Sequence, residues 1–141
     1  MPVFSNSIVP ITITIPGQPV AMGRPRLSRR GVYLPAKTKL ALKHFRDYLF
    51  NIPNIPGMIK MEVVFVMQRP KYMKAKKYSK QRIFHDKRPD LDNLLKLVAD
   101  GLQPKVLIDD AKIVMINASK VYAAEDEAPK TIIQLQQIQS I

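Results

Sequence analysis

The sequence has 141 residues, 46% of them hydrophobic, and its 23 lysines and arginines against 11 acids give a formal net charge of +12. It contains no cysteine, which excludes a disulfide framework, a thiolate zinc site and a thiol nucleophile. No apolar run approaches the roughly 18 to 20 residues that cross a bilayer, so we expect a soluble, unexported protein whose positive charge favours nucleic acid as its partner.

The first element is a strand that ends before a basic loop. Residues 11–15 alternate isoleucine with threonine, the pattern of a half-buried strand, and Pro16 and Gly17 end it. From Gly17 to Pro35 the chain is polar and is expected to form an exposed loop that contacts phosphate. Its candidate DNA-binding residues are Arg24, Arg26, Arg29 and Arg30. A merely solvated loop is the alternative.

A helix and a second strand follow. Apolar residues at helical spacing predict a helix that begins near Pro35 and is stopped by Pro53. Residues 59–67 predict a strand that is partly buried on both faces. The next stretch, residues 68–88, is strongly basic and interleaved with tyrosines, which suits DNA backbone binding, although it could be only a surface insertion. Its candidate DNA-binding residues are Lys71, Lys74, Lys76, Lys77, Arg82, Lys87 and Arg88.

The remaining elements complete a single predicted domain. We expect a second helix over residues 91–102, a strand near 112–122 and a last strand at 131–138. The resulting order, β-α-β-α-β-β, predicts an α+β fold in which the helices pack on a mixed sheet. The sequence contains no repeat or linker, so residues 1–141 are assigned to one domain.

Six of the 11 acids lie between positions 86 and 110, directly after the most basic stretch. At 100° per residue, the second helix places its leucines on one side and the polar residues Asp92, Asn93, Lys96 and Asp100 on the other. Asp90 follows Pro89 and suits the N-cap position, where its carboxylate is free to turn toward Asp92. One interpretation gives these residues structural roles only, as a cap and an i,i+4 ion pair.

A second acidic pair, Asp109 and Asp110, favours a metal site instead. It stands in a turn between the helix and the following strand, where carboxylates can be brought together. Converging carboxylates repel one another without a cation, and Mg²⁺ or Mn²⁺ prefers such oxygen ligands. We therefore expect Asp90, Asp92 and Asp110 to hold one or two metal ions, and Lys96 to contact the scissile phosphate or orient water.

The motif Asp90-Leu91-Asp92-Asn93-Leu94-Leu95-Lys96, followed by Asp100 and then by Ile108-Asp109-Asp110-Ala111 before a strand, resembles the RusA endodeoxyribonuclease family. The motif-bearing part covers roughly residues 87–121. The resemblance places the family's motif aspartates on Asp90 and Asp92, its motif lysine on Lys96 and its third catalytic aspartate on Asp110. Pro89 departs from the family pattern, since a basic residue is expected there, and residues 69–86 look like a longer insertion.

The resemblance implies an Mg²⁺-dependent endonuclease, with Mn²⁺ as a substitute ion, that resolves four-way (Holliday) junctions by symmetric cleavage. It further implies a homodimer that is encoded by a bacteriophage or prophage, works in the bacterial cytoplasm and serves DNA recombination or repair. The two departures put junction selectivity in doubt more than activity.

Two other readings stay open. Pro89-Asp90 with Asp110-Ala111-Lys112 imitates the PD-(D/E)xK nuclease pattern, which would make Lys112 the catalytic lysine and leave Asp92, Asn93 and Lys96 unexplained. The other reading is a non-catalytic DNA- or junction-binding protein whose aspartates serve only as caps and ion pairs. Loss of cleavage with retained binding on Asp92→Asn would separate the enzyme from the binder.

Overall fold

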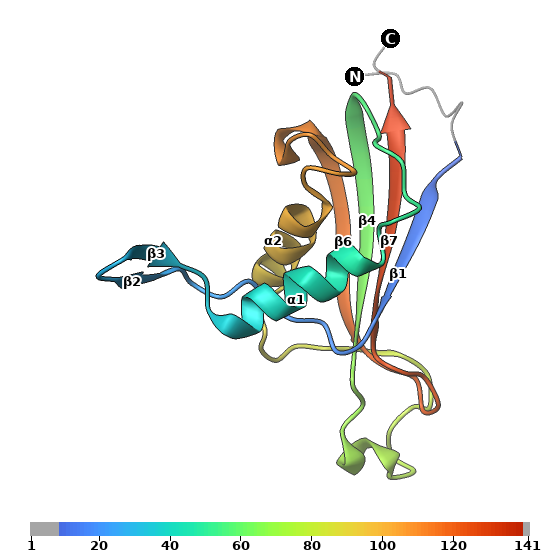
Figure 1. Ribbon diagram of the computed structural model, residues 1–141. Coiled ribbons are helices and arrows are strands. Elements are labelled where there is room, and N and C mark those ends of the chain that lie inside the picture. The colour runs from blue at the N-terminus through green and yellow to red at the C-terminus, as the bar shows by residue number, and fades with distance from the viewer. Residues whose placement is uncertain (1–8, 140–141) are drawn as a thin grey trace.

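The computed structural model describes residues 9–139 (Figure 1). In chain order its elements are β1 (Ile11–Pro16), β2 (Arg26–Ser28), β3 (Gly31–Tyr33), α1 (Ala36–Asp47), β4 (Met58–Met67), a 3₁₀ turn (Lys71–Lys74), β5 (Ile83–Phe84), α2 (Leu91–Leu102), a second 3₁₀ turn (Asp110–Lys112), β6 (Ile113–Tyr122) and β7 (Lys130–Ile138). Within this part of the chain, no helix is long and apolar enough to cross a membrane.

The main sheet has five strands in the order β1-β7-β4-β6-β5. β4 lies at its centre and pairs in parallel with β6 and antiparallel with β7. β1 pairs antiparallel with β7, so the first and last strands are neighbours. Parallel β4 and β6 require a long crossover, and that crossover carries α2. The sheet is therefore mixed, as the sequence predicts.

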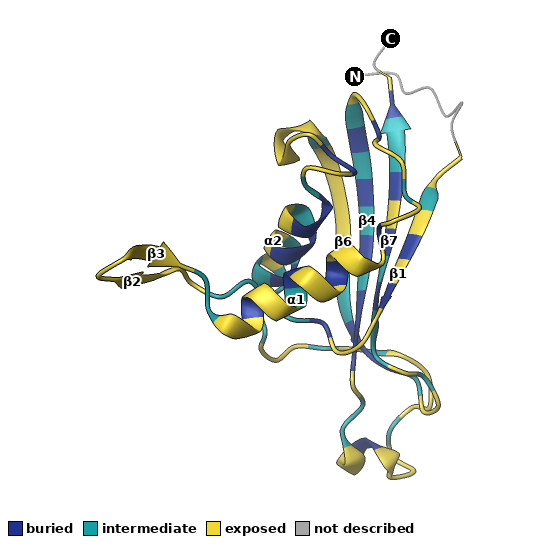
Figure 2. Cartoon of the chain, viewed as in Figure 1, coloured by how far each residue is buried: buried dark blue, intermediate teal, exposed yellow. Residues whose placement is uncertain are grey.

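Both helices lie on one face of the sheet (Figure 1), and the core fills the space between them and the strands (Figure 2). β4 contributes alternate buried residues such as Met61, Val63 and Phe65, while α2 contributes Leu94 and Leu102. This alternation matches the period of a strand, and the spacing on α2 matches one face of a helix. The predicted α+β class with helices packed on a mixed sheet is confirmed.

The structure departs from the sequence prediction in three places. α1 ends at Asp47 rather than continuing toward Pro53, because tight turns follow it. In these turns the Leu49 backbone N–H donates to the Arg46 carbonyl oxygen and the Ile52 backbone N–H donates to the Leu49 carbonyl oxygen. Residues 17–35 are not a simple loop, since they contain the β2–β3 hairpin. A further short strand, β5, lies within the basic stretch and pairs with the end of β6.

Two basic protrusions leave the body of the molecule (Figure 1). The hairpin (residues 26–33) is exposed along its whole length (Figure 2). The basic lobe (residues 68–88) is organised by Arg69, whose guanidinium donates to the carbonyl oxygens of Gln81, Ala123, Met73 and Ser79. Arg69 thus turns inward and holds the lobe together, leaving the lysines of the lobe exposed to solvent.

Candidate active site and nucleic-acid interface

The first turn of α2 carries two of the predicted site residues. Asp90 occupies the N-cap position with an extended backbone, as predicted, but its side chain makes no capping hydrogen bond and is exposed. Asp92 lies in the first turn, where the helix dipole favours a negative charge. Its Oδ1 accepts a hydrogen bond from the Asn93 backbone N–H at 2.9 Å. The Asp90 carboxylate is therefore free to take another partner.

The second acidic pair lies in the 3₁₀ turn that leads into β6. The Ala111 backbone N–H donates to Asp109 Oδ1 at 3.0 Å and lowers the pKa of Asp109. A hydrogen bond between the two carboxyl groups raises the pKa of Asp110, and the negative charges of Asp109 and Asp100 raise it further. Asp110 thus stands among other carboxylates, an arrangement that a cation relieves.

One shallow cavity joins the two acidic segments. Asp92 and Lys96 line it from α2, and Asp110 lines it from the 3₁₀ turn. Its volume is about 250 Å³, and its apolar walls come from α2, β4 and β6 through Met61, Leu95, Ala99, Ile113 and Ile116. The i,i+4 spacing puts Asp92 and Lys96 on one face of α2, and the crossover from α2 to β6 brings Asp110 opposite them.

The fold does not gather every predicted site residue. Asp90 and Lys112 are absent from the walls of this cavity. Among residues 9–139, no group of three or more acidic or histidine side chains is close enough to hold a metal ion as the side chains stand. Asp92 and Asp110 are consequently the two carboxylates that the cavity itself supplies.

Lys120, which the sequence patterns did not single out, holds the segment that precedes α2. Its Nζ donates to the carbonyl oxygens of Lys87 at 2.6 Å and Pro89 at 2.8 Å. The His85 backbone N–H donates to the Lys120 carbonyl oxygen at 3.0 Å. These bonds connect β6 to the segment of residues 85–89, which leads to Asp90. A lysine inside a strand carries no sequence pattern that would have revealed this role.

The predicted DNA-binding residues fall into two groups. Those on and just before the hairpin, Arg24, Arg26, Arg29 and Arg30, are all exposed. In the basic lobe, Lys71, Lys74, Lys76, Lys77, Lys87 and Arg88 are also exposed. Arg82 is exposed as well, but it already has an acidic partner. Its guanidinium makes a two-point ion pair with Glu127, at 2.9 Å through Nε and 2.5 Å through Nη2. Arg82 is thus already committed to holding the lobe against the β6–β7 connection.

A family model for the endodeoxyribonuclease RusA matches residues 16–136, which include both acidic segments and Lys96. The chain therefore belongs to the RusA endodeoxyribonuclease family, a family of DNA-cleaving enzymes that act on branched junctions. It is also 30% identical over 127 residues to the uncharacterized protein YqaN of Bacillus subtilis (strain 168), covering 82% of this chain and 89% of that protein. The resemblance found in the motif is confirmed.

Proposed function

We propose that the protein is a metal-dependent endonuclease that resolves four-way DNA junctions by symmetric phosphodiester hydrolysis. The observation that carries this proposal is the shared cavity of Asp92, Lys96 and Asp110. Family membership supports the nuclease activity. We place this activity in recombination or repair of DNA in the bacterial cytoplasm, on a phage or prophage genome.

The proposed metal ligands are Asp90, Asp92 and Asp110, with Mg²⁺ as the ion and Mn²⁺ as its substitute. Carboxylate oxygens are the donors that these ions prefer, and the hydrogen bond with Asp109 and the nearby negative charges raise the pKa of Asp110. Asp90 would complete the set, since its side chain makes no capping hydrogen bond. When bound, the metal supplies hydroxide from water and neutralises the developing charge on the phosphate.

The chain's own residues perform the remaining steps. Lys96 lines the same cavity as the carboxylates, and we expect its ammonium group to hold the scissile phosphate. Asn93 fixes Asp92 through its backbone N–H. The hairpin, the arginine just before it and the basic lobe supply the cations that bind the DNA backbone, namely Arg24, Arg26, Arg29, Arg30, Lys71, Lys74, Lys76, Lys77, Arg82, Lys87 and Arg88. We expect Arg82 to contribute least of these, since Glu127 neutralises it.

A homodimer is part of this proposal. A four-way junction has two equivalent strands to cut, and an isologous pair of subunits presents two equivalent sites. Size-exclusion chromatography with light scattering should give twice the chain mass of 16.1 kDa. A monomer that nicks only one strand would remove the symmetric part of the proposal.

The decisive experiment is cleavage of a labelled synthetic four-way junction, beside a linear duplex of the same sequence. With Mg²⁺ we expect symmetric nicks in the junction, loss of cleavage in EDTA and recovery with Mn²⁺. Asp92→Asn should reduce cleavage by at least about a hundredfold because it removes a metal ligand. Junction affinity should stay equal or increase, because less negative charge then faces the DNA.

Asp126→Asn is the matched control, because Asp126 is an exposed acid in the β6–β7 connection, away from the cavity. It should leave cleavage unchanged. Junction binding without cleavage in both metals would instead identify a non-catalytic junction-binding protein.

A further inference from the structure

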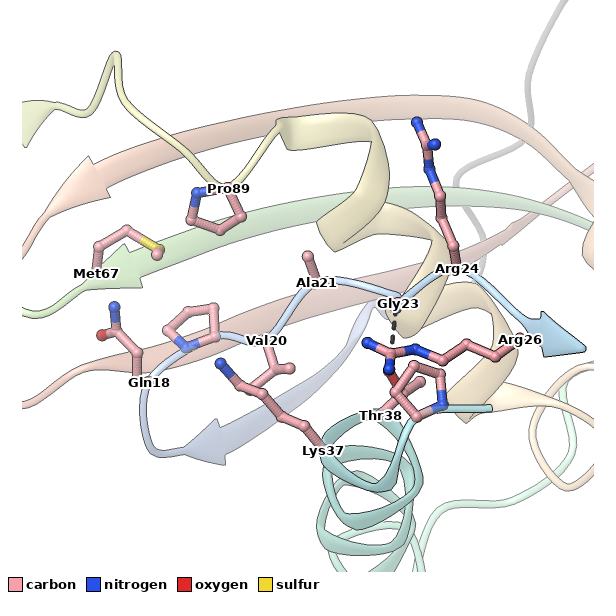
Figure 3. Close-up of a pocket in the computed structure, with 12 residues that line it drawn as sticks. Gln18, Val20, Ala21, Gly23, Arg24, Arg26, Lys37, Thr38, Met67 and Pro89 are labelled. Carbon is pink, nitrogen blue, oxygen red and sulfur yellow. Dashed lines mark hydrogen bonds between the residues drawn. The ribbon is translucent and has the colours of Figure 1, made fainter. Parts of the chain in front are cut away.

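A second cavity, of about 700 Å³, opens between the base of the hairpin and the base of the basic lobe. One wall is the strap, residues 17–25, which links β1 to β2 (Figure 3). The first turn of α1 forms another wall through Lys37 and Thr38. Met67 at the end of β4 and Pro89, which follows the lobe, close the remaining side. The cavity thus lies where the two basic protrusions meet the body.

The charge of this cavity is entirely positive. Arg24, Arg26 and Lys37 line it, and no acidic residue does. None of the three makes an ion pair within residues 9–139, where the pairs involve Lys60, Lys80, Arg82 and Lys130. Figure 3 shows the Arg26 side chain reaching back over Thr38, whereas Arg24 points away from it. Like charges around one hollow repel one another, and a bound anion offsets that repulsion.

The strap is fixed to both helices, which gives the cavity a defined shape. The Gly23 backbone N–H donates to the buried Thr38 hydroxyl at 3.0 Å (Figure 3). A Cβ at Gly23 would lie 2.6 Å from that oxygen and 3.0 Å from Pro35 Cγ, so only glycine allows this approach. One residue earlier, the Met22 backbone N–H donates to the Asn93 carbonyl oxygen at 3.0 Å.

The same strap therefore relates this cavity to the candidate active site. Pro89 lines the basic cavity, Asp92 lines the acidic one, and Asp90 lies between them in the chain. The bond from Met22 to Asn93 fastens the strap to the first turn of α2, beside both aspartates. The two cavities consequently flank the start of α2. Asp92 and Asp110 line one of them, and Arg24, Arg26 and Lys37 line the other.

We propose that the cavity lined by Arg26 and Lys37 binds one backbone phosphate of the cleaved DNA strand, within one or two nucleotides of the scissile phosphate. Arg26 supplies a planar fork of N–H donors and Lys37 a point charge, the two usual ways of holding a phosphate. The first turn of α1 has no acid and no side-chain cap, so its dipole adds to the attraction. For the identity of its ligand, this inference rests on the proposed function.

The test is a binding scan with methylphosphonate-substituted four-way junctions, in which one backbone charge at a time is removed from the cleaved strand. Binding is measured with Asp92→Asn protein, so that cleavage does not interfere. Affinity should fall about tenfold at one or two adjacent positions, the loss expected when a charged hydrogen-bonding partner disappears. The cleavage site itself is mapped separately with unsubstituted protein.

The pocket variant is Arg26→Gln with Lys37→Gln, and the control variant is Lys39→Gln with Lys43→Gln. Both pairs remove two positive charges, and all four residues are exposed. Lys39 and Lys43 lie on α1 but do not line the cavity. The control should keep the position-dependent loss. The pocket variant should bind the unsubstituted junction about tenfold more weakly and show less than a twofold further loss at the sensitive positions.

Three outcomes would overturn the inference. The first is an unchanged scan in the pocket variant, and the second is a sensitive position many nucleotides from the cleaved bond. The third is a scan with no sensitive position in the DNA, together with stabilisation of the wild-type protein but not the pocket variant by inorganic phosphate. In that case the cavity would bind a free anion. Absence of cleavage by the wild-type protein would contradict the proposed function and, with it, the position relative to a scissile phosphate. The scan would still decide whether the cavity binds a backbone phosphate, since it measures binding.

Discussion

Lys120 Nζ on β6 lies 2.8 Å from the Pro89 carbonyl oxygen, one residue before Asp90. Lys120→Met keeps the apolar stem but removes the donor for two carbonyl groups. We expect the free energy of unfolding to fall by about 1–2 kcal/mol and the cleavage rate at saturating DNA to fall further than junction affinity, because Asp90 loses its fixed position. Denaturant titration and single-turnover kinetics measure the two effects.

The control for this change is Lys60→Met on β4. The Lys60 ammonium pairs with Glu62 at 3.2 Å on a partly exposed part of the sheet, away from α2. It should change neither the stability by more than about 0.5 kcal/mol nor the cleavage rate. Equal effects of the two substitutions would show that Lys120 acts only as one more surface charge.

The RusA-type mechanism and the PD-(D/E)xK mechanism assign the catalytic lysine differently, the first to Lys96 and the second to Lys112. Lys96 lines the cavity with Asp92 and Asp110, whereas Lys112 lies in the 3₁₀ turn outside its walls. Lys96→Gln should lower the cleavage rate by about a hundredfold or more, and Lys112→Gln should change it less than threefold. Junction cleavage under single-turnover conditions decides between them. A larger loss in Lys112→Gln would favour the PD-(D/E)xK mechanism.

The pair of Arg82 and Glu127 should make stability depend on pH in acid. Hydrogen bonding to Arg82 lowers the pKa of Glu127 from its ordinary value of 4.5 to about 2. Because the folded-state pKa is depressed, the stabilisation is complete above about pH 4.5 and is lost as the pH falls toward 2. Glu127→Gln should therefore cost about 1 kcal/mol near neutral pH and little at pH 2.

Glu125→Gln is the control for that measurement, read as thermal or denaturant unfolding across the acid range. Its partner, Lys80 Nζ, lies 3.8 Å from Glu125 Oε2, and the lysine is largely exposed. We expect this exposed pair to contribute less than about 0.5 kcal/mol to stability. A Glu127→Gln curve that parallels the wild-type curve at every pH would contradict the role assigned to the ion pair.

The contact between α1 and α2 depends on the absence of a side chain at Gly101. A Cβ there would lie 2.4 Å from Phe45 Cδ1, and Phe45 is buried. Alanine usually favours a helix over glycine by up to about 1 kcal/mol, yet here the overlap should prevail and destabilise the protein by about 1–3 kcal/mol. In combination with Phe45→Leu the two costs should not add, and additive costs would contradict this packing argument.

The sequence predicts elements well where burial imposes a period. α2 runs from Leu91 to Leu102 as predicted, because its leucines share one face and Asp90 and Pro89 precede it. The β2–β3 hairpin was not predicted because Leu27 and Val32 both face water, so no buried period marks it. The parallel pairing of β4 with β6 also depends on contacts between distant segments, which local patterns do not contain.

The candidate site also has a part that local sequence patterns predict and a part that depends on the fold. Asp92 and Lys96 could be placed together from their spacing on one helix, whereas their meeting with Asp110 required the crossover to β6. The metal-ligand roles of Asp90, Asp92 and Asp110 stay predictions. The basic cavity had no sequence pattern, because Arg26 and Lys37 come to line one cavity through the fold of the strap, which the bond of Gly23 to Thr38 holds against α1.

The position of β7 between β1 and β4 has a consequence for how the chain folds during synthesis. Among the described residues, β1 has no other strand partner, so Ile11–Pro16 stay unpaired until residues 130–138 leave the ribosome. Contacts between such distant segments make folding slow, and an unpaired strand edge favours aggregation meanwhile. We therefore expect the nascent chain to depend on its last strand for a complete sheet, and a chain that stops before β7 to accumulate as insoluble material.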